Sequence, residues 1–204
     1  VPNTYKKMEE AGWDLSGVEL SLRNPAPNPI TTYMVFEEKG GEERIIDPIS
    51  LIIETMSRLR PEEKAWVQIV VKPVLPDWQK EGQKAIDEVK QKSVSKQGAD
   101  GKVIFSLMTP DQEEKLKMIS RKISKPGFEV IVRTVYIAPK DIFDRNLLKN
   151  LTGYFNQYSS NLNYFQFSPD TFTKAYWYKW PFLFPDKRTK VKKDRLLNRY
   201  VQRY

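Results

Sequence analysis

Apolar residues recur along this chain in two spacings, one typical of strands and one typical of amphipathic helices. The pattern predicts strands at residues 30–37, 66–71, 128–137 and 162–167, and a brief edge strand at residues 18–22. It predicts single helices over residues 48–59 and 140–158, and a helical pair within residues 77–124. Mixed strands and helices of this length indicate an α+β domain.

Capping residues support the predicted helix boundaries. Asp47 and Pro48 form a helix start, with an N-cap carboxylate followed by proline at the first helical position. Thr109 and Gln112 have the spacing of a capping box, again with a proline, Pro110, in the first turn. We expect that helix to end at residues 125–127, a Lys-Pro-Gly sequence.

Residues 66–71 form a short apolar run that only Gln68 interrupts. Runs of this kind are typical of strands buried on both faces. We therefore predict a central strand here, with Trp66 as a core residue and with Pro73 and Pro76 ending the strand.

Without the helical pair, the element order is β-α-β-β-α-β, the order of the split βαβ or ferredoxin-like fold. This order predicts an antiparallel sheet with two helices on one face and the helical pair inserted between two strands. We divide the chain into an extended N-terminal segment at 1–29, an α+β domain at 30–168 with its insertion at 77–124, and a C-terminal extension at 169–204. Ser, Lys, Gln and Gly at residues 93–100 predict the most mobile internal segment.

The C-terminal extension carries the net charge of the chain. Residues 174–204 contain ten Lys or Arg residues and two Asp residues, a balance of +8 that equals the net charge of the whole sequence. The preceding residues are therefore neutral overall. A neutral body with a basic extension predicts a surface that binds something acidic.

Aromatic residues precede the basic run, so two kinds of anionic partner fit the composition. Nucleic acid would stack bases on the rings and place phosphates on the cations. An anionic membrane surface would take the aromatic rings at headgroup level. A third reading is a helix over residues 187–204 that packs against neighbouring protein. The candidate contact residues are Trp177, Trp180, Lys187, Arg188, Lys190, Lys192, Lys193, Arg195, Arg199 and Arg203.

The sequence contains no motif for a catalytic, cofactor-binding or metal-binding site. The chain has neither His nor Cys, which removes thiolate metal sites, the commonest metal ligand and the Ser-His-Asp triad. The Gly101-Lys102 pair lacks the upstream glycine and the following Ser or Thr of a phosphate-binding loop. We predict no enzyme activity, no cofactor and no metal. No apolar run reaches the roughly 20 residues that span a bilayer.

Several short sequence segments occur in a fixed order over most of the chain. They are residues 29–33 (PITTY), 47–49 (DPI), 63–69 (EKAWVQI), 77–78 (DW), 107–110 (LMTP), 125–130 (KPGFEV), 161–165 (NLNYF) and the basic run ending at Arg199 and Tyr200. In these segments the chain resembles a group of membrane-anchored proteins of candidate-phyla bacteria. That group is associated with type IV secretion and conjugation-like DNA-translocating ATPases.

The resemblance implies a transmembrane segment upstream and an extension downstream, and the start at Val1 agrees with a piece of a longer protein. It supplies no catalytic residue. We expect a non-catalytic module at the cytoplasmic face of the membrane that contacts protein, such as a DNA-translocating ATPase. The alternative is a nucleic-acid-binding module that uses the aromatic and basic tail.

Overall fold

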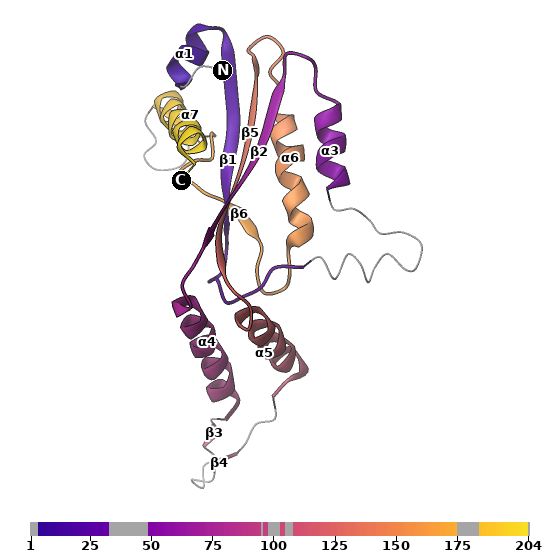
Figure 1. Ribbon diagram of the computed structural model, residues 1–204, viewed down its shortest axis with the longest axis vertical. Helices are drawn as coiled ribbons and strands as arrows, with labels where there is room; N and C mark the ends of the chain where they lie inside the picture. The colour runs from indigo at the N-terminus through magenta and orange to yellow at the C-terminus, as the bar shows by residue number, and fades with distance from the viewer. Residues whose placement is uncertain are drawn as a thin grey trace, which may run out of the picture.

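The computed structural model describes residues 4–32, 49–94, 96–97, 103–104, 108–174 and 184–203 (Figure 1). The chain is an α+β protein built on a four-stranded antiparallel sheet. Its strands are β1 (Trp13–Leu22), β2 (Lys64–Pro73), β5 (Phe128–Pro139) and β6 (Phe165–Phe167), and β3 (Lys96–Gln97) pairs with β4 (Val103–Ile104) in a separate small sheet. The helices are α1 (Tyr5–Glu10), α3 (Ser50–Ser57), α4 (Asp77–Val94), α5 (Pro110–Ile123), α6 (Asn146–Gly153), the 3-10 helix η1 (Tyr154–Tyr158) and α7 (Pro185–Gln202).

The strand order in the main sheet is β2-β5-β1-β6, and each neighbouring pair is antiparallel. β5 is the longest strand and pairs with β2 from Phe128↔Pro73 to Ile137↔Lys64. β1 pairs with β5 from Trp13↔Pro139 to Leu20↔Val132, so the first residues of β5 pair with β2 alone. Fewer strands are therefore paired at the end of the sheet where β5 begins than at the end where β5 finishes.

The sheet order corrects two predictions. The brief edge strand expected at residues 18–22 is part of a ten-residue strand that lies between β5 and β6. The central strand expected at residues 66–71 is an edge strand, and Trp66 is only partly buried. Polar Ser16 and Glu19 interrupt the apolar pattern of the interior strand β1. In the apolar run of β2, Ile69 and Val71 are exposed and the other residues are only partly buried.

Helices cover both faces of the sheet (Figure 1). α3 and α6 lie on one face, here called the first face, where Ile52 and Leu151 join a core with Val18, Leu20 and Tyr136. This is the helix pair that the sequence predicted on one face.

α1 and α7 lie on the opposite, second face. Met8, Leu196 and Leu197 there form a core with Leu15 and Val135 of the sheet. The sequence did not predict this second layer.

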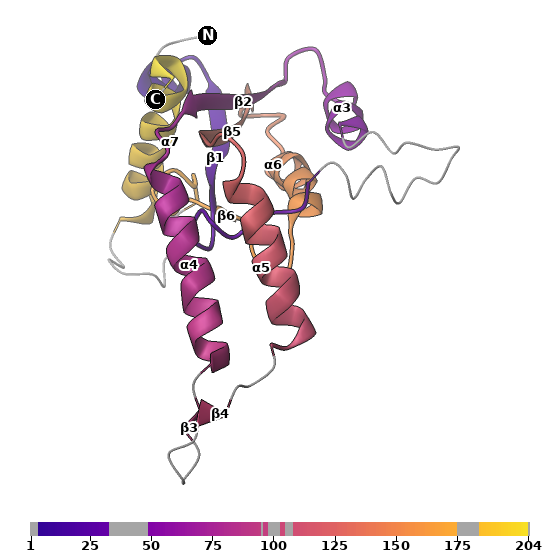
Figure 2. The same cartoon turned by 60° about the horizontal axis from the view of Figure 1, so that its bottom comes forward.

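α4 and α5 form an antiparallel helical pair that projects from the end of the sheet (Figure 2). Ile86 and Ile119 are buried in it, and Gln79 Nε2 donates to the Ile123 carbonyl at 2.8 Å. The capping box predicted at Thr109 and Gln112 is confirmed. The pair connects β2 to β5, as the sequence predicted.

The proline-rich connector after β1 is held by one buried side chain. Asn163 donates to the carbonyls of Asn24 and Asn28 and accepts from the backbone N–H groups of Asn24 and Tyr164. All four bonds are between 2.9 and 3.1 Å. Asn163 thereby satisfies backbone polar groups of a connector whose prolines prevent it from joining a strand ladder.

Other predicted elements changed in extent. α3 matches the helix expected at 48–59, although its predicted cap at Asp47 and Pro48 lies outside the described residues. The helix expected at 140–158 begins at Asn146 and ends as η1. The last strand has only three residues. Most of the strand expected at 30–37 lies outside the described residues. Of the mobile segment expected at 93–100, residues 93–94 end α4 and residues 96–97 form β3, and the other half lies outside the described residues.

Candidate interaction surfaces

α7 is packed on the second face of the sheet, so much of the basic extension belongs to the folded domain. Leu196 and Leu197 are fully buried, and the Tyr200 ring stacks on Trp66 with centroids 5.1 Å apart. A Cβ on Gly17 of β1 would lie 2.6 Å from Leu196 Cδ2 and 2.5 Å from the Thr134 carbonyl oxygen. The absence of a side chain at Gly17 therefore allows α7 to approach the sheet closely.

Lys193 of α7 is buried and donates to the Asp14 carboxylate of β1 and to the Tyr5 hydroxyl. Burial on its own would raise the pKa of Asp14, but the hydrogen bond and charge of Lys193 outweigh it and lower that pKa. Burial also lowers the pKa of Lys193 despite the adjacent carboxylate, because an ammonium loses more hydration here than the pair restores. Tyr5 donates to Asp14 at 2.8 Å, and burial together with this carboxylate raises the pKa of Tyr5.

Glu19 of β1 is the centre of a second charged cluster on the same face. Arg133 of β5, whose side chain is fully buried, reaches it at 3.3 Å, and Arg199 of α7 reaches it at 2.7 Å. Gln68 of β2 accepts from Arg133 at 2.9 Å and donates to the Tyr200 carbonyl at 3.1 Å. This cluster joins α7 to three strands of the sheet.

The other candidate contact residues of α7 lie nearer solvent. Lys190 pairs with Glu9 at 2.8 Å, Arg195 lies 3.9 Å from Asp170, and Lys187 lies over the Phe184 ring at 4.9 Å. Arg203 is exposed at the helix end, and Arg188 and Lys192 are partly buried. Trp177 and Trp180 lie outside the described residues. The structure thus brings Lys193 and Arg199 into internal ion pairs, which leaves fewer cations for an external anion.

Four exposed apolar side chains form an apolar strip on the first face, beyond the cover of α3 and α6. They are Ile69 and Val71 of β2, 59% and 55% exposed, and Val130 and Phe128 of β5, 47% and 59% exposed. The register aligns them on one face, because Ile69 is opposite buried Val132, Val71 is opposite Val130, and Pro73 is opposite Phe128. Sequence reasoning placed these residues in strands but took the apolar character of residues 66–71 as a sign of burial.

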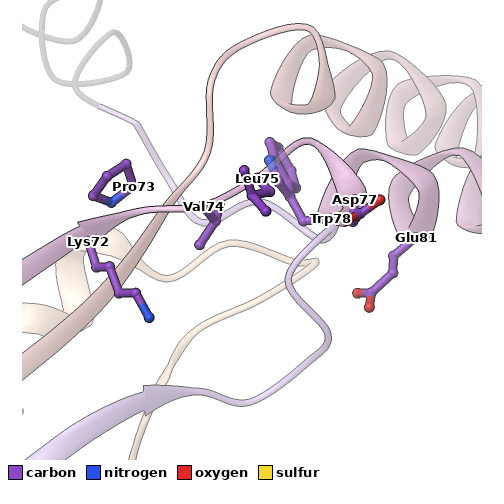
Figure 3. A pocket seen from close by; sticks show the side chains of 7 residues that line it. All are labelled: Lys72, Pro73, Val74, Leu75, Asp77, Trp78 and Glu81. Carbon is purple, nitrogen blue, oxygen red and sulfur yellow. The ribbon is translucent and has the colours of Figure 1, made fainter.

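A pocket adjoins the apolar strip where β2 leads into α4. Figure 3 shows its lining side chains, which come from the end of β2, the connecting residues and the first turns of α4. They are Lys72, Pro73, Val74, Leu75, Asp77, Trp78 and Glu81. Leu75 is 77% exposed, which extends the apolar surface from the sheet toward the helical pair.

The described residues contain no group of three or more Asp and Glu side chains placed to hold a metal ion. Within the same residues, no helix is long and apolar enough to cross a membrane.

The sequence profile of one family matches residues 5–180, from α1 to beyond β6. This family is described as Domain of unknown function (DUF8128). The chain belongs to the DUF8128 family. No curated protein and no solved structure is significantly similar to it. In this DUF8128 chain the matched range includes the whole four-stranded sheet and the apolar strip, whereas α7 follows it in sequence.

Proposed function

We propose that this DUF8128 domain is a non-catalytic protein-binding module of a membrane-anchored accessory protein. In this proposal the domain lies at the cytoplasmic face of the membrane, in a type IV secretion or conjugation-like system, and contacts its DNA-translocating ATPase. The resemblance of the short sequence segments is the reason for proposing this secretion system. The apolar strip is the reason for proposing that the domain binds protein. The apolar strip is the single observation that carries the proposal.

A protein fits the apolar strip as a binding partner better than a small molecule does. Ile69, Val71, Val130 and Phe128 lie side by side on an open face rather than in an enclosed cavity. Small-molecule sites are concave and bury most of the ligand, whereas contiguous exposed apolar patches mark protein contacts. The helical pair beside the strip offers further surface to a partner (Figure 2).

We also propose that the core of the domain has the split βαβ topology. The supporting observations are the chain order β1, α3, β2, β5, α6, β6 and the antiparallel strand order β2-β5-β1-β6. α4 and α5 are then an insertion in the connection between β2 and β5, and α1 and α7 are additions on the second face.

Site-specific photocrosslinking in the full-length protein tests the proposed contact. A photoreactive amino acid replaces Phe128 in the apolar strip, and the matched control replaces Tyr164, which is 44% exposed and lies just before β6. We expect the Phe128 position to crosslink to the translocating ATPase in cells and the Tyr164 position to do so far less. Equal labelling from both positions, or no ATPase among the Phe128 products, would contradict the proposal.

Nucleic-acid binding through the C-terminal extension is the second candidate. Lys187 on α7 and Arg203, directly after its C-terminus, are exposed and available to phosphates. Against it, Lys190, Lys193 and Arg199 already pair with acidic residues of the domain. Binding through about six phosphates would lose roughly 10³-fold in affinity between 50 and 200 mM salt. We expect only weak, salt-sensitive binding, measured by fluorescence anisotropy with single- and double-stranded DNA; tight, salt-resistant binding would favour the second candidate.

A further inference from the structure

In the part of the chain that the structure describes, the ten-residue strand β2 has a paired strand on one side only. β2 pairs with β5 on one side, and among the described residues no backbone group pairs with its other side. Figure 2 shows β2 along one border of the main sheet. Open edges of this length are templates for another strand, and monomeric proteins usually protect them with charges, prolines or bulges.

The protection of β2 is confined to its ends. Lys64 and Lys72 are exposed, and Pro73 cannot donate a ladder hydrogen bond. The five residues from Val67 to Val71 carry no charge, and Ile69 and Val71 expose more than half of their side chains. The middle of the strand is therefore suited to pairing.

The sequence of β2 is complementary to itself in one antiparallel register. Two copies related by a two-fold axis must place some residue opposite its own copy, since antiparallel partners share a side-chain direction. An axis at Gln68 would set Lys64 opposite Lys72 at both ends, a destabilising pairing of like charges. An axis at Val70 would set Val67 opposite Pro73 and shorten the ladder.

An axis at Ile69 avoids both faults. It sets Ile69 opposite Ile69 and Val67 opposite Val71, which joins the apolar residues of the first face across the axis. On the second face it sets Lys72 opposite Trp66, a pairing that favours a cation–π contact. Lys72 then faces an uncharged residue rather than a second lysine.

We infer that β2 pairs with β2 of a second copy of this chain, antiparallel and centred on Ile69, and so joins two four-stranded sheets into one continuous sheet across two protomers. The pairing doubles the apolar strip into one surface on the first face. This contact between copies is independent of the ATPase contact proposed above, because the purified chain forms it without any other protein.

Cysteine crosslinking tests the register directly, because the chain has no native cysteine. Ile69→Cys places two thiols opposite each other across the axis, where facing residues have Cα atoms about 4.5–5.5 Å apart, within disulfide range. Ile53→Cys is the matched control, since Ile53 is likewise an exposed isoleucine, 58% accessible, and belongs to α3 rather than to β2. Under mild oxidation we expect a disulfide-linked dimer from Ile69→Cys at least about tenfold faster than from Ile53→Cys.

The oligomeric state supplies the second measurement. Analytical ultracentrifugation of the unmodified chain should show a dimer, and Ile69→Lys should raise its dissociation constant at least about tenfold while Ile53→Lys leaves it unchanged. Circular dichroism confirms that both variants fold, which both should because these positions are exposed. A monomer at concentrations up to about 1 mM, or a dimer that Ile69→Lys does not weaken, would overturn the inference.

Discussion

Arg133 of β5 lies 3.3 Å from the Glu19 carboxylate of β1, with its side chain fully buried beneath α7. The second oxygen of that carboxylate accepts from Arg199 of α7 at 2.7 Å. One acidic residue in the middle of a strand thus compensates a buried cation and fixes the C-terminal helix. The relationship explains why β1 carries a glutamate in the interior of the sheet.

Glu19→Ala should destabilise the domain by about 3–5 kcal/mol, because it leaves Arg133 buried without its carboxylate. Urea denaturation followed by tryptophan fluorescence measures the change. Asp170→Ala is the control, since it removes only the exposed partner of Arg195 and should cost less than about 1 kcal/mol. Similar losses for the two variants would contradict the assigned role of Glu19.

The stability of the domain should fall in acid partly through Asp14. Its pKa in the folded protein is below the ordinary value, so its contribution is complete at neutral pH and is lost as the pH falls through the lowered pKa. The difference in unfolding free energy between the native chain and Asp14→Asn should therefore shrink between about pH 5 and pH 2. A constant difference over this range would show that Asp14 is not held ionised by Lys193.

Trp66→Ala should cost about 1–3 kcal/mol, less than the roughly 3–5 kcal/mol of a fully buried tryptophan. Trp66 lies on an edge strand, packs against the core of the second face and stacks on the Tyr200 ring. A double-mutant cycle with Tyr200→Ala should give a coupling energy of about 0.5–1.5 kcal/mol. Additive losses would mean that the two rings do not stack in solution.

Gly17→Ala should destabilise the domain by about 1–3 kcal/mol, because the added methyl group would overlap Leu196 and the Thr134 carbonyl. Gly153→Ala is the matched control, because a methyl group added to this glycine of α6 would have no neighbour within 4 Å. That control should stabilise the domain by about 0.4–1 kcal/mol. Thermal unfolding of both variants measures the contrast, and equal effects would mean that α7 does not approach β1 closely.

Most elements with local signals were predictable from the sequence. The capping box at Thr109, the apolar stripe of α3 and the long β-branched strand β5 depend on residues a few positions apart, so their patterns are visible along the chain. The α+β class followed from these elements. The concentration of positive charge in the last residues was also a property of the sequence alone.

Contacts between distant residues decided which strands are interior and what the C-terminal helix does, and these appeared only in the folded structure. Glu19 made β1 resemble an edge strand, because its partners Arg133 and Arg199 lie 114 and 180 residues away in sequence. The apolar run of β2 resembled a buried strand, because a single sequence does not distinguish apolar residues that face the core from apolar residues that are exposed, such as Ile69 and Val71. Lys193 and Arg199 resembled free cations, because their acidic partners lie on a strand near the other end of the chain.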